Sequence, residues 1–351
     1  MTSIHDLARE TGVSTATVSR ALRGLPRVSE ETRTKVLDAA VRLGYVPSPH
    51  AVGLASGGRT RTVAIVVLFV TRWYFATVVH GAEQVLRQQG YDVLLYNIGG
   101  DPQARRRVLL TGMVTKRADA LIVVGLGPTP EEVLWLSRHG MPVATIGARV
   151  RTWPSVRVDD VGVARTAMGH LLDLGHRRIA YVGQLDDDGL ELATPRERRQ
   201  GYREALEAAG IAFDPALEVE GHFTTEGGHD AGERLLAMPD PPTAVFCASD
   251  EMAFGVMHAA REAGVRVPED LSVVGVDDHE LAQWLGLTSV RQPVVQQGRV
   301  AARQELSLLH PEDHGDGHDS TVAEHVEVPT ELVVRRSTAA CRDGLSGQRS
   351  E

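Results

Sequence analysis

The residues best suited to recognise another molecule gather near the start of the chain. A short run carries hydroxyl side chains and two arginines at helical spacing: Ser14, Thr15, Ala16, Thr17, Ser19, Arg20 and Arg23. Small side chains permit close approach, Thr15 and Ala16 can contact thymine methyls, and the Arg20 guanidinium can donate two hydrogen bonds to guanine. This set is suited to base edges in duplex DNA. An ordinary helical bundle with polar caps is the structural alternative.

The charge distribution supports a nucleic-acid partner at this end only. The whole chain carries a net charge of -9, which by itself argues against DNA binding. Residues 1–61 contain nine arginines and lysines against five acidic residues, a local charge of +4 that leaves -13 for the remainder. A basic segment on an acidic body confines phosphate attraction to one end.

Three short helices are predicted to position these side chains. Ser3 is suited to cap a helix through Glu10, and Gly12 permits the left-handed turn that follows. Ser14 and Ser29 are suited to cap the second and third helices. Two short helices joined by a glycine turn form a helix-turn-helix, whose second helix enters the major groove. A small core is expected from apolar residues that include Val36, Leu37, Ala40 and Leu43.

The segment after these helices has two possible interpretations. Residues 49–56, with Pro49, Ala51 and Gly53, could form a short hinge helix. A helix below about 12 residues is marginal in water, so it would form only against a partner chain and DNA. Leu54 is then a candidate for insertion between base pairs in the minor groove. The alternative is a flexible linker.

The chain resembles the lactose/galactose repressor family. The resemblance begins with Ile-His-Asp-Leu-Ala-Arg-Glu-Thr-Gly-Val-Ser-Thr-Ala-Thr-Val-Ser-Arg-Ala-Leu at 4–22 and continues with Gly-His-Arg-Arg-Ile-Ala-Tyr-Val-Gly at 175–183 and Val-Val-Gly-Val-Asp-Asp at 273–278. It implies a dimeric repressor with an effector-binding, periplasmic-binding-protein-like body. It also implies that Thr15, Ala16 and Arg20 face bases and that Leu54 is the minor-groove lever. The hinge departs from the family pattern at Pro49, His50 and Gly53, which weaken the predicted hinge helix.

Independently of the resemblance, the body alternates apolar strands with amphipathic helices. Strands are predicted at 63–68, 91–97, 120–125, 143–146, 178–183, 244–248 and 271–276. Such alternation predicts an α/β fold with parallel, doubly wound sheets. Two sheets divided near Asp159 would form two lobes, with 294–309 returning to the first lobe and 331–335 to the second. Ligands bind such sheets at the carboxyl ends of their strands.

Residues that follow strand ends are therefore the ligand candidates. Trp73, Tyr74 and Phe75 form an aromatic cluster after the first strand, and rings of this kind stack on apolar faces of sugars or bases. At least one of these three rings is expected to belong to the core instead. An arginine and a carboxylate facing one cleft would bind a polyhydroxylated ligand. By resemblance, effector contacts are made by Arg198, Phe223, Ser249 and Asp277. Asp250 and Asp278 are as readily explained as helix caps, and Gly147 stands where the family usually has an acidic residue.

No sequence pattern indicates catalysis or a cofactor, and no metal ligands are assigned. Gly125 and Gly127 lack the third glycine of a dinucleotide-binding loop, and no P-loop or nucleophile elbow is present. His310, His314 and His318 could bind a transition metal, but the glycines and acidic residues of this stretch are more typical of a solvated loop. Cys247 and Cys341 form no disulfide framework, which favours the cytoplasm. The longest apolar runs are far shorter than the roughly 20 residues of a membrane span, and no signal peptide is recognised.

These observations predict a helix-turn-helix domain at 1–46, a hinge and linker at 47–61, a bilobed body at 62–340 and a polar tail at 341–351. The first lobe would comprise 62–159 and 288–322, and the second 160–286 and 324–340. The predicted protein is a homodimeric, ligand-responsive repressor that binds a near-palindromic operator, with a sugar or another small metabolite in the cleft. The main alternative function is that of a solute-binding or sensor protein, and an enzyme that uses the cleft is the third hypothesis.

Overall fold

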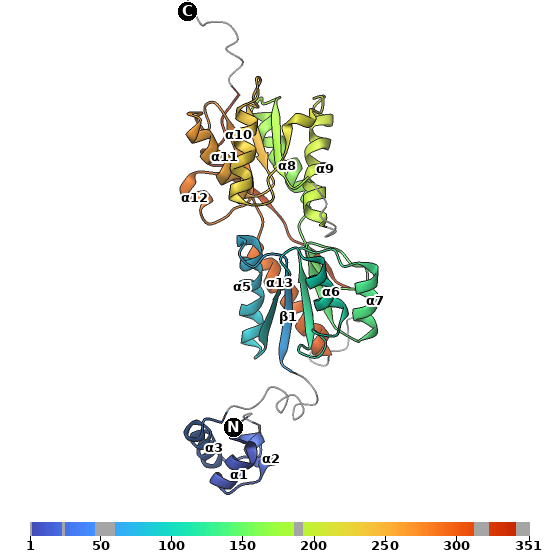
Figure 1. Ribbon diagram of the computed structural model, residues 1–351, viewed down its shortest axis with the longest axis vertical. Coiled ribbons are helices and arrows are strands. Elements are labelled where there is room, and N and C mark those ends of the chain that lie inside the picture. The colour runs from blue at the N-terminus through green and yellow to red at the C-terminus, as the bar shows by residue number, and fades with distance from the viewer. Residues whose placement is uncertain (1, 23–24, 46–59, 186–191, 312–322, 342–351) are drawn as a thin grey trace, which may run out of the picture. The chain divides into compact units, whose positions relative to one another are not determined.

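The computed structural model divides the chain into two compact units, 1–62 and 63–351. The described residues are 2–22, 25–45, 60–185, 192–311 and 323–341. Figure 1 shows a small helical unit at the N-terminus and a larger α/β unit. No helix among the described residues is long and apolar enough to cross a membrane.

The N-terminal unit contains three helices, α1 (Ile4–Thr11), α2 (Thr15–Leu22) and α3 (Glu30–Leu43). Ser3 caps α1 in a capping box with Asp6, and Gly12 ends α1 in the left-handed conformation at φ 69°. Ser29 caps α3. The buried core consists of Leu7, Val18, Ala21, Val36 and Ala40.

The prediction that Leu37 belongs to the core of this unit is wrong. Leu37 is 44% exposed, whereas Ala39 is fully buried. On α3 the inward-facing stripe passes through Val36, Ala39 and Ala40, which follow the i, i+3, i+4 spacing of one helix face. Leu37 lies about 100° around the helix from Val36 and faces away from that stripe.

The larger unit contains two six-stranded sheets, each built mainly from parallel strands. The first sheet has the order β11-β5-β4-β3-β1-β2 and the second β12-β10-β9-β8-β6-β7. The strands of the first sheet are β1 (Thr62–Val67), β2 (Asp92–Asn97), β3 (Ala120–Val124), β4 (Val143–Ile146), β5 (Ser155–Arg157) and β11 (His325–Glu327). Those of the second are β6 (Ile179–Gly183), β7 (Glu218–Glu220), β8 (Ala244–Cys247), β9 (Ser272–Asp277), β10 (Thr288–Arg291) and β12 (Glu331–Val333), of which β12 runs antiparallel to β10.

Helices cover both faces of each sheet, as Figure 1 shows for the second, where α10 and α11 lie on one side and α8 and α9 on the other. The first lobe, meaning the first sheet and its helices, contains α5 (Trp73–Gln88), α6 (Pro102–Leu110), α7 (Pro130–Arg138) and α13 (Val294–Leu309). The second lobe contains α8 (Asp160–Asp173), α9 (Ala193–Ala208), α10 (Thr225–Leu236), α11 (Asp250–Glu262) and α12 (Ala282–Leu285), with the short 3-10 helix η1 (Pro215–Leu217). The predicted α/β class with two doubly wound sheets is confirmed.

The seven predicted strands are all present, and 294–309 packs on the first lobe as expected. Two short segments lie on the opposite lobe from the one predicted: β10 pairs with β9 in the second sheet, and β11 pairs with β5 in the first. The described chain therefore passes between the lobes at 157–160, 291–294 and 327–331. The four-residue strands β4 and β8 lie in apolar runs, whereas β10 (TSVR) and β11 (HVE) do not, so no sequence pattern indicated their position.

Candidate functional site

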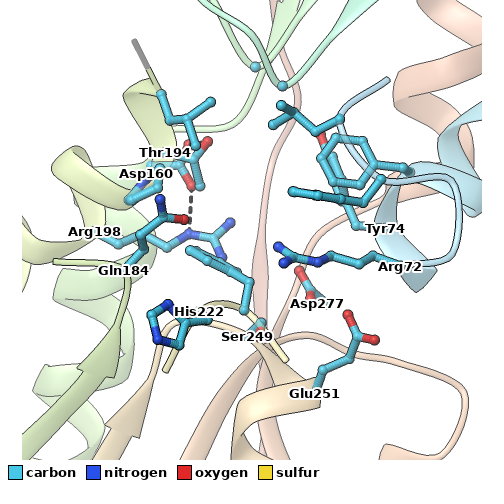
Figure 2. Close-up of a pocket in the computed structure, with 18 of the residues that line it drawn as sticks. Arg72, Tyr74, Asp160, Gln184, Thr194, Arg198, His222, Ser249, Glu251 and Asp277 are labelled. Atoms are coloured by element: carbon cyan, nitrogen blue, oxygen red, sulfur yellow. Dashed lines mark hydrogen bonds and ion pairs between the residues drawn. The ribbon is translucent and has the colours of Figure 1, made fainter. Parts of the chain in front are cut away.

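A cavity of about 340 Å³ lies between the two lobes of the larger unit. Most of its lining residues follow the carboxyl ends of parallel strands, where α/β sheets bind ligands. Thus Leu68 follows β1, Gln184 follows β6, and Ser249 comes shortly after β8. Figure 2 shows Asp160, Gln184 and Arg198 facing Tyr74 and Arg72 across this cavity.

A buried ion pair forms one wall of the cavity. Arg198 Nε donates to Asp160 Oδ1 at 2.8 Å, and its Nη1 donates to the Ala248 carbonyl at 2.5 Å. Both charged side chains are almost fully buried. Burial tends to lower the pKa of Arg198, but the nearby Asp160 and Asp277 charges raise it above its usual value. A guanidinium held in this way presents fixed donors to a ligand.

A chain of hydrogen bonds crosses the cavity from one lobe to the other. Tyr74 donates to Gln297 Oε1 at 3.0 Å, Gln297 donates to Gln292 at 2.9 Å, and Gln292 donates to Asp277 Oδ1 at 2.5 Å. Burial raises the pKa of the Asp277 carboxyl to about 7, although the Arg198 charge and the Gln292 hydrogen bond oppose that rise. The buried Asp277 carboxyl therefore offers a polar group to a ligand at the wall of the cavity.

Three cavity residues adopt the left-handed backbone region that non-glycine residues rarely occupy. The φ angles are 51° for His222, 52° for Phe223 and 121° for Asp277. Each such residue costs about 1–3 kcal/mol and persists only where the surrounding structure imposes it. Such residues cluster at ligand-binding sites, so their presence here supports this cavity as the candidate functional site of the larger unit.

A second hollow of about 320 Å³ adjoins the first and shares Gly147 with it. Three arginines line this hollow, Arg149, Arg157 and Arg196, together with Glu197. Arg157 lies 3.9 Å from Glu197 and 3.8 Å from Glu327, whereas Arg149 and Arg196 are exposed. Gly147 has φ 85°, so a side chain there would strain the backbone at the junction of the two hollows.

The N-terminal unit presents the predicted DNA-contacting residues on α2. The Ser14 hydroxyl accepts from the Thr17 amide at 3.1 Å and so caps this helix. Ala16 and Arg20 are exposed, and Thr15, Thr17 and Ser19 are half-buried. Two predicted DNA-binding residues, Arg23 and Leu54, and the hinge candidates Pro49, Ala51 and Gly53 lie outside the described residues.

Comparisons with known proteins agree with this arrangement. Residues 3–48 match the model of bacterial regulatory proteins of the lacI family, and residues 168–338 match a periplasmic binding protein-like domain. The chain is 35% identical to catabolite control protein A of Priestia megaterium over 340 residues, covering 96% of this chain and 99% of that protein. This chain belongs to the LacI family. The family consists of transcriptional regulators rather than enzymes.

Solved structures of LacI-family proteins have the same fold. A complex of the transcriptional regulator CelR with cellobiose superimposes with a TM-score of 0.69 at 32% identity, covering 96% of this chain and all of that one. The lac repressor dimer bound to operator and an anti-inducer gives a TM-score of 0.79 at 25% identity, with 97% and 99% of the two chains covered. The family resemblance inferred from the motifs is confirmed.

Of the seven effector residues predicted for this LacI-family chain, six line the cavity: Tyr74, Phe75, Arg198, Phe223, Ser249 and Asp277. Trp73 is not among its lining residues. The Trp73 indole lies 4.8 Å from the His279 ring and donates to Glu280 Oε2 at 3.4 Å, so it contacts the second lobe beside the cavity. Asp250 begins α11, but its buried carboxylate accepts from the Ser289 hydroxyl and the His279 amide, and Asp278 pairs with Arg291 and Arg335.

Sequence reasoning missed several polar residues of the cavity. They come from helix starts, strand ends and crossing segments, and include Arg72, Asp160, Gln184, Thr194, His222, Glu251, Gln292 and Gln297. Gln184 and His222 directly follow strands or their turns, so the strand-end argument could have found them. Gln292 and Gln297 lie at or just after a crossing between the lobes, and their position at the cavity depends on tertiary packing that the sequence pattern does not predict.

Proposed function

We propose that this chain is a transcriptional repressor that binds a near-palindromic operator as a homodimer, and that a small polyhydroxylated molecule in the cavity sets its affinity for DNA. The observation that carries the proposal is that one chain combines a helix-turn-helix, with Ala16 and Arg20 exposed on α2, and a cavity walled by the buried Arg198–Asp160 ion pair. Action on DNA places the protein in the cytoplasm. A solute-binding protein, the alternative function, does not account for the exposed residues of α2.

A sugar fits the chemistry of the cavity. Arg198 supplies donors, Asp277 and Asp160 supply acceptors, and the rings of Phe75 and Phe223 supply apolar faces. Hydroxyl groups satisfy the polar side chains, while the C–H faces of a pyranose stack on rings. The volume lies within the range of about 300–1,000 Å³ found for small-molecule pockets. The cellobiose complex and a ribose-bound LacI-family regulator from Enterococcus faecium, which is 26% identical, support this class of ligand.

The adjoining hollow points to a ligand longer than a single ring. Gly147 belongs to both hollows, and no side chain separates them at that position. A second sugar ring or an anionic substituent extending past Gly147 would meet the Arg149 and Arg196 guanidiniums. We therefore expect disaccharides or acidic sugars to bind more tightly than unmodified monosaccharides.

A surface for the second subunit is proposed on the second lobe. Leu281, Trp284 and Leu285 are 47%, 75% and 51% exposed and are adjacent in the chain at α12. Exposed apolar clusters of this kind mark contact surfaces, and a two-fold dimer buries the same patch of both subunits. The dimeric lac repressor with its operator supports this mode of assembly.

The DNA-binding assignment is tested with Arg20→Ala. Selection from random duplexes by the full-length protein identifies its preferred site. Loss of a guanidinium–guanine contact is expected to reduce discrimination by about 1–3 kcal/mol at one position of each half-site. Arg42→Ala on α3 is the matched control, because Arg42 is exposed and paired with Glu10. Equal specificity profiles for wild type and Arg20→Ala would refute the assignment.

The cavity is tested by a thermal-shift screen of monosaccharides, disaccharides and sugar acids against the full-length protein. A ligand at 100 times its Kd raises stability by about 2.7 kcal/mol. A hit that stabilises wild type but not an Asp277→Ala variant supports the site. A hit that stabilises both proteins equally binds elsewhere and contradicts it.

The roles of the hinge residues Pro49, Ala51 and Gly53 and of Leu54 stay predictions. If Leu54 inserts into the minor groove, Leu54→Ala should weaken specific DNA binding more than non-specific binding.

A further inference from the structure

A cluster of metal-ligating side chains lies on the second lobe, and its residues do not line the cavity. His229 belongs to α10, whereas His258 and Glu262 lie one turn apart on α11. One nitrogen of each imidazole and one Glu262 carboxylate oxygen lie within 4.8 Å of one another. All three side chains are accessible to solvent.

Close packing of α10 on α11 sets the spacing of these side chains. A Cβ at Gly255 would overlap the Thr225 carbonyl oxygen and the His229 amide nitrogen, and a Cβ at Gly228 would overlap the Met252 backbone. The two helices therefore touch backbone to backbone beside His229, without a side chain between them. Because His258 lies three residues after Gly255, its position relative to α10 is fixed by the same contact.

Both histidines direct the same ring atom toward one carboxylate. His229 Nε2 lies 2.8 Å from Glu262 Oε2, and His258 Nε2 lies 3.5 Å from Glu262 Oε1. Ligand atoms of a tetrahedral zinc ion, each about 2.0–2.1 Å from the metal, stand at separations similar to these. Small rotations of exposed side chains would bring the three atoms around one ion.

The surroundings of His229 add a feature typical of metal-binding histidines. Its other nitrogen, Nδ1, lies 3.5 Å from Asp230 Oδ1. A proton held on Nδ1 by this carboxylate would leave the Nε2 lone pair for a metal, which would replace the present hydrogen bond between Nε2 and Glu262. Glu233 is also within reach of His229 and increases the local negative charge.

We propose that His229, His258 and Glu262 bind one divalent transition-metal ion per chain, with water completing the coordination. Two imidazoles and one carboxylate favour Zn²⁺, Co²⁺ or Ni²⁺ over Mg²⁺ and Ca²⁺, which take oxygen ligands. The bound ion would fasten α10 to α11. These helices begin beside cavity residues Phe223 and Ser249, so the ion would stabilise one side of the cavity.

The test is a Zn²⁺ titration of the untagged full-length protein in competition with a chromophoric chelator. We expect one zinc ion per chain in the wild type, and affinity lower by at least about tenfold in His258→Gln and in His229→Gln. His80→Gln is the matched control, because His80 is exposed on α5 and bonded only to Gln84 among the described residues. Asp230→Asn should weaken binding less than loss of a ligand.

The double variant His314→Gln/His318→Gln separates this site from the other histidine-rich segment. Zinc binding that disappears in this double variant but persists in His258→Gln would overturn the proposal, as would equal affinity in wild type, His229→Gln and His258→Gln. Circular dichroism and operator binding confirm that each variant is folded. Co²⁺ gives an independent readout, because its visible absorption spectrum in the wild type should change in His258→Gln and remain unchanged in His80→Gln.

Discussion

Replacement of Arg198 by methionine should strongly destabilise the larger unit. The Arg198 and Asp160 side chains are 3% and 4% exposed, and their ion pair is 2.8 Å long. Methionine fills similar space but leaves the Asp160 carboxylate buried beside the Thr194 hydroxyl, which donates to it at 3.0 Å. Removal of one partner from a buried pair costs about 3–5 kcal/mol, because the remaining charge is uncompensated.

Urea-induced unfolding, followed by circular dichroism, measures this loss. The double variant Arg198→Met/Asp160→Asn should regain most of the stability, because it removes the orphaned charge. Arg165→Met is the surface control, since the Arg165 and Glu204 side chains are 60% and 42% exposed and surface pairs contribute about 0–1 kcal/mol. The reasoning is refuted if Arg198→Met is no less stable than the control, or if the double variant is no more stable than Arg198→Met.

Three further predictions concern other parts of the molecule. In Asp277, burial raises the folded-state pKa to about 7 from an ordinary value of 3.8, so the folded chain binds this proton more tightly and stability falls as the pH rises from about 4 to about 7. Asp277→Asn should therefore show a shallower decline in urea midpoint over that interval, and an unchanged decline would contradict the assigned shift. Gly255→Ala should destabilise the larger unit by at least about 1–3 kcal/mol, because the added Cβ would overlap the backbone of α10. Gly169→Ala should stabilise it by about 0.5–1 kcal/mol, because the space beside Gly169 in α8 is open. Thermal midpoints that move in the same direction for both variants would refute this contrast. Trp284→Ser should weaken the dimer in sedimentation equilibrium, and an unchanged dissociation constant would exclude α12 from the interface.

The sequence predicted the strands that carry strong apolar runs and the cavity at their carboxyl ends. It could not decide which residues of an aromatic cluster face a ligand. Trp73, Tyr74 and Phe75 begin α5 and point in directions about 100° apart, so they cannot all face one cavity. The structure directs Tyr74 and Phe75 to the cavity and Trp73 to His279.

Other parts of the cavity depend on contacts between distant segments. Asp160 follows the short strand β5 at a crossing between the lobes, and its contacts with Arg198 and Thr194 distinguish it from a helix-capping residue. Gln292 and Gln297 acquire their role from the hydrogen bonds that join Tyr74 to Asp277. Local periodicity carries no information about such long-range pairs.

The most direct test of the regulatory proposal is the affinity of the full-length protein for its selected operator, measured by fluorescence anisotropy with and without the carbohydrate identified by thermal shift. Coupling between two sites typically amounts to about 1–3 kcal/mol, so saturating ligand should change the Kd for DNA by about 5–150-fold. Asp277→Ala should bind the same operator without responding to the ligand. Equal operator affinity of the wild type with and without a ligand that demonstrably occupies the cavity would contradict the proposal.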